Sequence, residues 1–184
     1  MAGRGAFLDS FRLFGNGTEN YDDLFQEKLG LLLKLRSGEP VTWSGKYRPP
    51  LRGELLLPRP VQDPLPVWVG VGGSPNSVVR AAEFGLPMAL GTIGGLVEQF
   101  RPLADLYRQA LEHYGQPVQP LAMTLHGFVA DTSQRAADAY FPGDAALFNA
   151  VGGTRGVHAV TAEQVAAKLR TEPPSEATIG PAQE

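Results

Sequence analysis

The segment Gly72-Gly73-Ser74-Pro75-Asn76-Ser77 has the residue types and spacing best suited to ligand binding in this sequence. It follows an apolar run, and its two glycines allow a ligand to approach the backbone closely. Ser74 is a suitable N-cap residue, and proline is favoured at the next position. Because backbone N–H groups and the dipole at a helix N-terminus attract anions, the pattern predicts a phosphate site. Its candidate residues are Gly72, Gly73, Ser74 and Ser77. The alternative is an ordinary tight turn between a strand and a helix.

Three further residues are candidates for the same ligand site. Gly94 follows the next apolar segment and would flank the ligand, unless it is only a backbone hinge. Arg4, between two glycines, is a cation suited to phosphate or carboxylate; a solvated terminal arginine is the alternative. His126 lies on the more polar face of a predicted strand, which points inward in a closed barrel. It would line a substrate pocket or donate a proton, and a hydrogen-bonded core histidine is the alternative.

The sequence offers no metal site and identifies no catalytic residue. The three histidines, His113, His126 and His158, lack the spacing of metal ligands. There is no cysteine, which excludes thiolate metal sites, disulfides and cysteine nucleophiles.

The elements that would position the candidate residues repeat in the order strand, glycine-containing loop, helix. Apolar runs predict strands at residues 67–71, 88–90 and 121–130. Helical spacing and caps predict helices at residues 77–84, 96–114 and 131–140, the last capped by Asp131. This alternation is typical of a parallel sheet in an α/β protein.

We predict a single domain over residues 1–184 with four parts. An apolar stripe predicts a helix over residues 21–33 that ends near Gly38. Residues 41–47 predict a short hairpin, and the prolines that follow exclude a central strand. The parts are a glycine loop and helix (1–40), the hairpin and proline-rich connection (41–66), three βα units (67–140) and an insertion-like helical tail (141–184).

Composition narrows the classes of protein that fit. The 184 residues carry a net charge of −3, which argues against a nucleic-acid partner bound through phosphate neutralisation. Hydrophobic residues make up 43% and charged residues 19%, as expected for a globular chain with a core. No apolar run reaches the length of a membrane span, and no secretory signal is present. We expect a cytoplasmic protein without a membrane partner.

Several segments, in order along the chain, resemble one known family. They are Gly3-Arg4-Gly5-Ala6-Phe7, Tyr21-Asp22-Asp23-Leu24-Phe25, Val41-Thr42-Trp43-Ser44-Gly45, the stretch from Pro60 to Ser74, and Ala81-Ala82-Glu83-Phe84-Gly85. The ordered set resembles the luciferase-like monooxygenases, flavin-dependent (β/α)₈ barrels that include the bacterial luciferase subunits. The similarity extends from about residue 3 to residue 140.

The resemblance implies a flavin, FMN or alternatively a deazaflavin coenzyme, at the C-terminal mouth of the barrel. It places the flavin phosphate on Arg4, Gly73, Ser74 and Ser77. The implied activity is flavin-dependent oxidation or monooxygenation of a small organic substrate. A non-catalytic flavin-binding protein and an inactive truncated fragment remain alternatives, and homo- and hetero-oligomers are both left open.

Two departures from the family pattern stand out. Where several members have an arginine for the phosphate, early in the helix after the glycine loop, this chain has Asp22. The carboxylate would repel phosphate, so either binding is weaker or another cation substitutes, with Lys46, Arg48 and Arg52 as candidates. A complete barrel has about 250 residues, so we expect a partial barrel with the middle and C-terminal βα units, without the front strands and the last helix.

Overall fold

The computed structural model describes residues 1–5, 8–15, 17–92 and 97–155, which form two compact units. The first unit runs from Met1 to His126, and the second begins at Gly127. In chain order the first unit contains α1 (Leu8–Leu13), α2 (Tyr21–Leu35), β1 (Val41–Trp43), β2 (Leu51–Glu54), β3 (Val69–Val71), α3 (Pro75–Glu83), β4 (Met88–Gly91), the 3₁₀ turn η1 (Val97–Phe100), α4 (Arg101–His113) and β5 (Leu121–Thr124). The second unit contains α5 (Ser133–Arg155).

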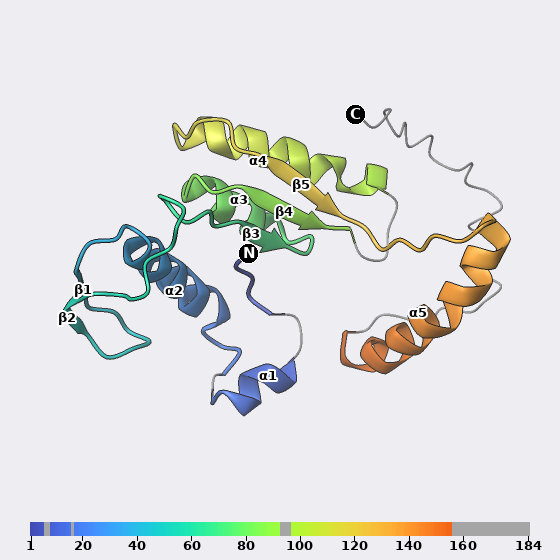
Figure 1. Ribbon diagram of the computed structural model, residues 1–184, viewed down its shortest axis with the longest axis horizontal. Coiled ribbons are helices and arrows are strands. Elements are labelled where there is room, and N and C mark those ends of the chain that lie inside the picture. Colours follow the sequence, from blue (N-terminus) through green and yellow to red (C-terminus); the bar gives the residue numbers. More distant parts are fainter. Residues whose placement is uncertain (6–7, 16, 93–96, 156–184) are drawn as a thin grey trace. The chain divides into compact units, whose positions relative to one another are not determined.

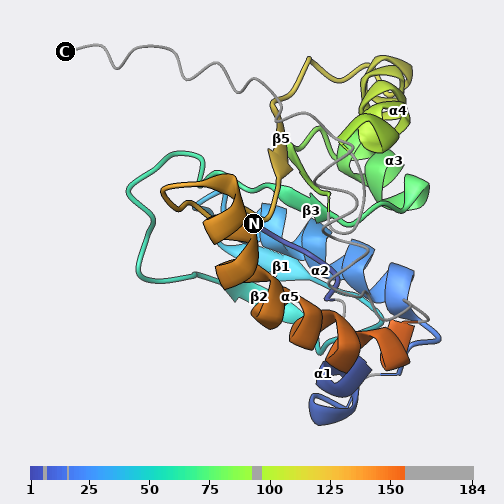
Figure 2. The same ribbon diagram turned by 90° about the vertical axis from the view of Figure 1, so that its right-hand side faces the viewer.

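The centre of the first unit is a parallel sheet in the order β3-β4-β5. Val69 pairs with Met88, which pairs with Leu121, so these side chains share one face of the sheet. Helices α3 and α4 cover that face together (Figures 1 and 2). The predicted alternation of strand, loop and helix is therefore confirmed as an α/β arrangement.

The hydrophobic core lies between the sheet and these helices. Its largest fully buried side chains are Tyr107, Met88, Leu90, Val69 and Val78. The Tyr107 hydroxyl donates a 2.5 Å hydrogen bond to the carbonyl of Leu86, and burial raises the pKa of Tyr107 to about 12. The phenol thus satisfies a buried backbone acceptor while its ring fills the core.

The opposite face of the sheet carries small side chains. Gly70, Ala89 and Ala122 are in register across the three strands, followed by Gly91 beside Thr124. Along each strand these small residues alternate with the residues that face the core, because successive side chains of a strand point to opposite faces of the sheet.

The hairpin differs from the prediction. Strand β1 pairs antiparallel with β2, which lies at Leu51–Glu54 and not within residues 41–47. The prolines at 49, 50 and 58 flank β2 and do not interrupt it, so a two-stranded ribbon can form there. The Glu27 carboxylate of α2 accepts the backbone N–H groups of Lys46 and Tyr47 and ties the intervening loop to that helix.

The predicted third strand also needs correction. It was expected to reach residue 130, but β5 ends at Thr124. Thr124 is paired with Gly91, the last residue of β4, and its carbonyl accepts the N–H of Thr92, the last described residue of that segment. A strand is defined by ladder hydrogen bonds to its neighbour, and β5 ends where the pairing with β4 ends.

Helix α5 of the second unit is longer than predicted. It was expected to end near Tyr140 but continues to Arg155 across Pro142. A proline fits helical φ and removes one hydrogen bond, so a long helix can continue past it at a cost of about 3 kcal/mol. Its first turn is capped by Thr132, whose hydroxyl accepts the N–H of Arg135, and not by Asp131.

We expect the Tyr107 hydrogen bond to contribute measurably to stability. Replacing Tyr107 with Phe leaves the buried carbonyl of Leu86 without its donor and should lower the free energy of unfolding by about 1–3 kcal/mol. Urea denaturation measures this. Tyr114→Phe is the control because Tyr114 is exposed, and it should change the value by less than about 0.5 kcal/mol. Equal effects of the two substitutions would contradict the assignment.

Candidate phosphate site

Backbone pairing places both Arg4 and the Gly72–Ser74 turn at the carboxyl end of the sheet. Ala2 forms a parallel bridge with Val69: its N–H donates to Trp68 O and its carbonyl accepts from Gly70 N, both at 2.7 Å. Because the two segments run in parallel, Arg4 lies two residues beyond this bridge, as Val71 does on β3. Arg4 is thus placed beside the carboxyl end of β3, where the turn begins.

The turn has the conformation that the glycines predict. Gly73 has a φ of +114°, which L side chains rarely adopt, and a Cβ at either Gly72 or Gly73 would meet nothing within 4 Å. The backbone is therefore open to a ligand at both positions. No other residue type would adopt this φ at Gly73 without strain.

The turn leads directly into the N-terminus of α3. Ser74 is the N-cap residue, with extended backbone angles, and its side chain makes no capping hydrogen bond. Its carbonyl accepts the first helical N–H groups, from Ser77 and Val78. Pro75 has no N–H, and the first turn contains no acidic residue. The half-buried Ser74 hydroxyl and the helix dipole can both favour an anion, while Ser77 is buried at 5% exposure.

Two other predicted residues are not placed at this turn. Gly94 lies outside the described residues. His126 is exposed and lies two residues beyond the end of β5, in a loop and not on a strand. Its predicted role in a substrate pocket stays a prediction.

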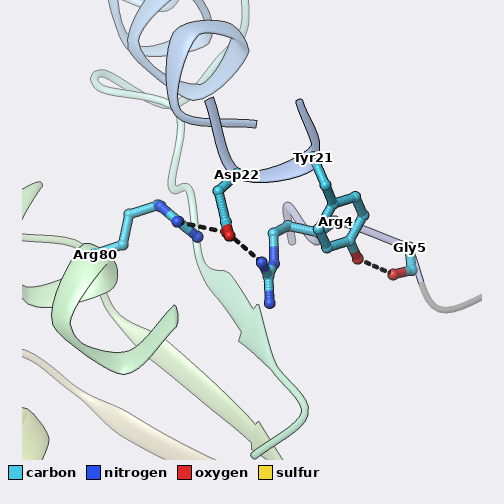
Figure 3. Close-up of polar contacts among 5 residues, drawn as sticks. All are labelled: Arg4, Gly5, Tyr21, Asp22 and Arg80. Carbon is cyan, nitrogen blue, oxygen red and sulfur yellow. Dashed lines mark hydrogen bonds and ion pairs between the residues drawn. The ribbon is translucent and has the colours of Figure 1, made fainter. Parts of the chain in front are cut away.

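Arg4 is held by the start of α2 (Figure 3). Its guanidinium lies over the ring of Tyr21, 4.5 Å from the centroid, and donates a hydrogen bond to the Asp22 carboxylate. The Tyr21 hydroxyl in turn donates to the carbonyl of Gly5. Stacking and ion pairing together hold the guanidinium in place, and its side chain keeps 19% exposure.

Arg80 is a second arginine beside Asp22, and the sequence analysis did not single it out. Its Nη2 lies 2.7 Å from Oδ1 of Asp22, the same oxygen that Arg4 contacts (Figure 3). The side chain is 8% exposed, and its Nη1 has no hydrogen-bond partner among the described residues. The available signal was a charged residue inside the apolar segment Val78-Val79-Arg80-Ala81-Ala82, because a buried arginine needs a partner.

Asp22 therefore has two cations beside it. The structure places Arg4 and Arg80 against it, whereas Lys46 lies over the ring of Tyr47. The hydrogen bond from Arg80 is the main cause that holds the pKa of Asp22 below its usual 3.8, with Arg4 acting in the same direction and burial opposing. The carboxylate is ionised at neutral pH, and the three side chains have a formal net charge of +1.

Comparison with known proteins gives the family. The sequence model described as luciferase-like monooxygenase matches residues 1–179. The chain belongs to this family, as its resemblance implied. No curated protein matches the sequence.

Solved structures give the same fold. Monooxygenase RslO1 from Streptomyces bottropensis is 25% identical with a TM-score of 0.70, and the match covers 83% of this chain and 48% of that one. An F420-dependent secondary alcohol dehydrogenase in complex with an F420-acetone adduct is 18% identical (TM-score 0.65; 91% and 51%). The oxygenating constituent of 3,6-diketocamphane monooxygenase from Pseudomonas putida, in complex with FMN, is 17% identical (TM-score 0.61; 90% and 54%).

The chain therefore spans about half the length of these structures. Its α/β sheet corresponds to part of a (β/α)₈ barrel, as expected. Among the described residues no cluster of His, Asp or Glu could hold a metal ion. None of the described helices is long and apolar enough to cross a membrane.

Alanine substitutions at the two glycines of the turn should differ in their effect on the free energy of unfolding. Gly73→Ala forces a side chain into the φ of +114° and should lower the free energy of unfolding by about 1–3 kcal/mol. Gly72→Ala meets equally open space without that φ and should change it by less than about 1 kcal/mol. Urea denaturation of both variants measures the difference. Equal losses would show that Gly73 is not constrained as described.

Proposed function

We propose that the chain binds the phosphate of a flavin at the Gly72–Ser74 turn and belongs to a flavin-dependent oxidoreductase or monooxygenase acting on a small organic substrate. The observation that supports this is the parallel pairing of Ala2 with Val69, which aligns Arg4 with that turn. By this pairing Arg4, the open backbone of Gly72 and Gly73, and the N-terminus of α3 all belong to the carboxyl end of the sheet. Each of them favours a phosphate dianion.

FMN is the proposed cofactor, and a deazaflavin coenzyme is the alternative. Of the structurally similar proteins, one is in complex with FMN and another with an F420 adduct. The residues of this chain fit a phosphate group on three counts: open space at both glycines, an arginine donor without a partner, and no acid in the first turn of α3. Parallel titrations with FMN and F420 would distinguish the two cofactors.

The chain's own groups would bind and orient the cofactor. Arg4 would donate to phosphate oxygens, the N-terminus of α3 would favour their negative charge, and the Ser74 hydroxyl would donate a hydrogen bond. When bound, the flavin would supply the redox chemistry. No catalytic side chain is assigned, and Gly94 and His126 remain predicted contributors to cofactor and substrate binding.

A flavin-binding protein without catalytic activity, or an inactive fragment, is the second candidate. It is kept as an alternative because no catalytic side chain is assigned in this chain, which matches 48–54% of the length of the similar structures. Oxygen consumption with reduced FMN and candidate substrates separates the two functions. Turnover supports the enzyme, and stoichiometric FMN binding without turnover supports the binding protein. A cytoplasmic location, inferred from the absence of cysteine, also remains a proposal.

A charge at the N-cap of α3 tests the phosphate site. Ser74→Asp places a carboxylate where the phosphate is proposed to bind and should weaken FMN at least several-fold. Aspartate is as good an N-cap as serine, so the helix should remain folded. The measurement is an FMN fluorescence titration of both proteins, repeated with riboflavin, which lacks the phosphate and should be unaffected.

The matched control is Ser44→Asp, an exposed serine that follows β1, which adds the same charge elsewhere. It should leave the FMN affinity within about twofold of the original. Unchanged FMN affinity in Ser74→Asp, or equal weakening by both substitutions, would contradict the assignment of the turn.

A further inference from the structure

A single carboxylate oxygen holds two arginines together. Oδ1 of Asp22 accepts from Nη1 of Arg4 and from Nη2 of Arg80 (Figure 3). The two guanidiniums come from segments far apart in the sequence and both pair with this carboxylate. Asp22 is half exposed, at 52% for its side chain, so a solute can reach the group that joins them.

Arg80 has hydrogen-bonding capacity that the described part of the chain does not use. Its side chain is more than nine-tenths buried, and Nη1 has no partner among the described residues. An arginine presents five N–H donors in a planar fork, and a buried donor without an acceptor is costly. A second acceptor beside Asp22, such as an oxygen of an anion, would satisfy this unpaired nitrogen.

Both arginines belong to segments that border the Gly72–Ser74 turn. Arg4 follows the strand-like residue Ala2, which is paired with β3, and Arg80 lies in α3, the helix that begins after Ser74. An anion at the turn would attract both guanidiniums, which are already paired with Asp22. The bound anion and the carboxylate would carry like charges on the same two cations.

We propose that Asp22 is an internal anion that competes with the cofactor phosphate for Arg4 and Arg80. This inference rests on the proposed binding of a phosphate-bearing flavin at the turn. In the ligand-free chain Asp22 neutralises part of the charge of the buried Arg80 and keeps the two guanidiniums together. When phosphate binds, it takes the unused donor of Arg80 and shares Arg4 with the carboxylate. Asp22 therefore lowers the affinity for phosphate and not for the rest of the flavin.

Asp22→Asn tests the competition, with Asp23→Asn as the matched control. Asparagine retains an oxygen that can accept from Arg80, so the variant should fold. Asp23 is the next residue in the first turn of α2, is exposed, and carries the same charge. We expect Asp22→Asn to bind FMN at least about fivefold more tightly and Asp23→Asn to stay within about twofold. Riboflavin affinity should be the same in all three proteins.

The opposite result would overturn the proposal. If Asp22→Asn binds FMN no better than Asp23→Asn, Asp22 does not compete; if it binds less well, Asp22 positions the arginines for the ligand. Equal tightening of riboflavin would place the effect away from the phosphate. Fluorescence titration gives each affinity.

Arg80→Lys provides a second variant with Asp22 intact. Lysine keeps the positive charge beside Asp22 but loses the fork that leaves Nη1 free, so FMN should bind at least about threefold more weakly with riboflavin unchanged. Unchanged FMN affinity would remove Arg80 from the site.

Inorganic phosphate separates failure of this inference from failure of the proposed function. If no variant binds FMN, the proposed function is wrong, and thermal denaturation with added phosphate then decides the inference. A larger stabilisation by phosphate in Asp22→Asn than in Asp23→Asn would support competition at the arginine pair. Equal stabilisation of the two variants would overturn it.

Discussion

The parallel pairing of Ala2 with Val69 is the interaction on which the candidate site depends. Two backbone hydrogen bonds of 2.7 Å align the N-terminal segment with β3, so that Arg4 lies at the carboxyl end of the sheet. Without this alignment Arg4 would be a charged residue between two flexible glycines. In open parallel sheets ligands bind at the carboxyl ends of the strands, because the loops and helix N-termini gather there. The position of Arg4 in the candidate site therefore depends first on the parallel direction of the two segments. Its side-chain contacts come second.

The second constraint is the charge of the candidate site, which combines two arginines with one aspartate. Arg80 is buried among apolar residues of α3 and needs a counter-ion, which Asp22 supplies from a helix 58 residues earlier in the sequence. The same carboxylate also pairs with Arg4. An acid that seemed unfavourable for phosphate binding thus has a structural role, since removing the partner of a buried arginine leaves an uncompensated charge. Under the proposed function, folding favours the Asp22 carboxylate whereas phosphate binding is opposed by it.

Much of the fold was predictable, because local patterns determine it. The apolar run before Gly72 predicted a buried strand, and β3 occupies its second half. The glycines after it predicted a turn, and Gly73 has the positive φ that only glycine adopts readily. The less accurate predictions concern ends and partners: β5 stops at Thr124 because β4 ends beside it, and β1 pairs with β2 at residues 51–54. Such limits depend on a neighbouring strand that local sequence does not describe.

The sequence by itself determined the α/β order, the turn at Gly72–Ser74 and the helix that starts after it, because each rests on residue types within a few positions. It also marked Arg4 and Asp22 as charges to be explained. Only the tertiary structure decided that Arg4, Asp22 and Arg80 meet. Contacts between residues 18 and 58 positions apart follow from how strands and helices pack, and no local pattern specifies them.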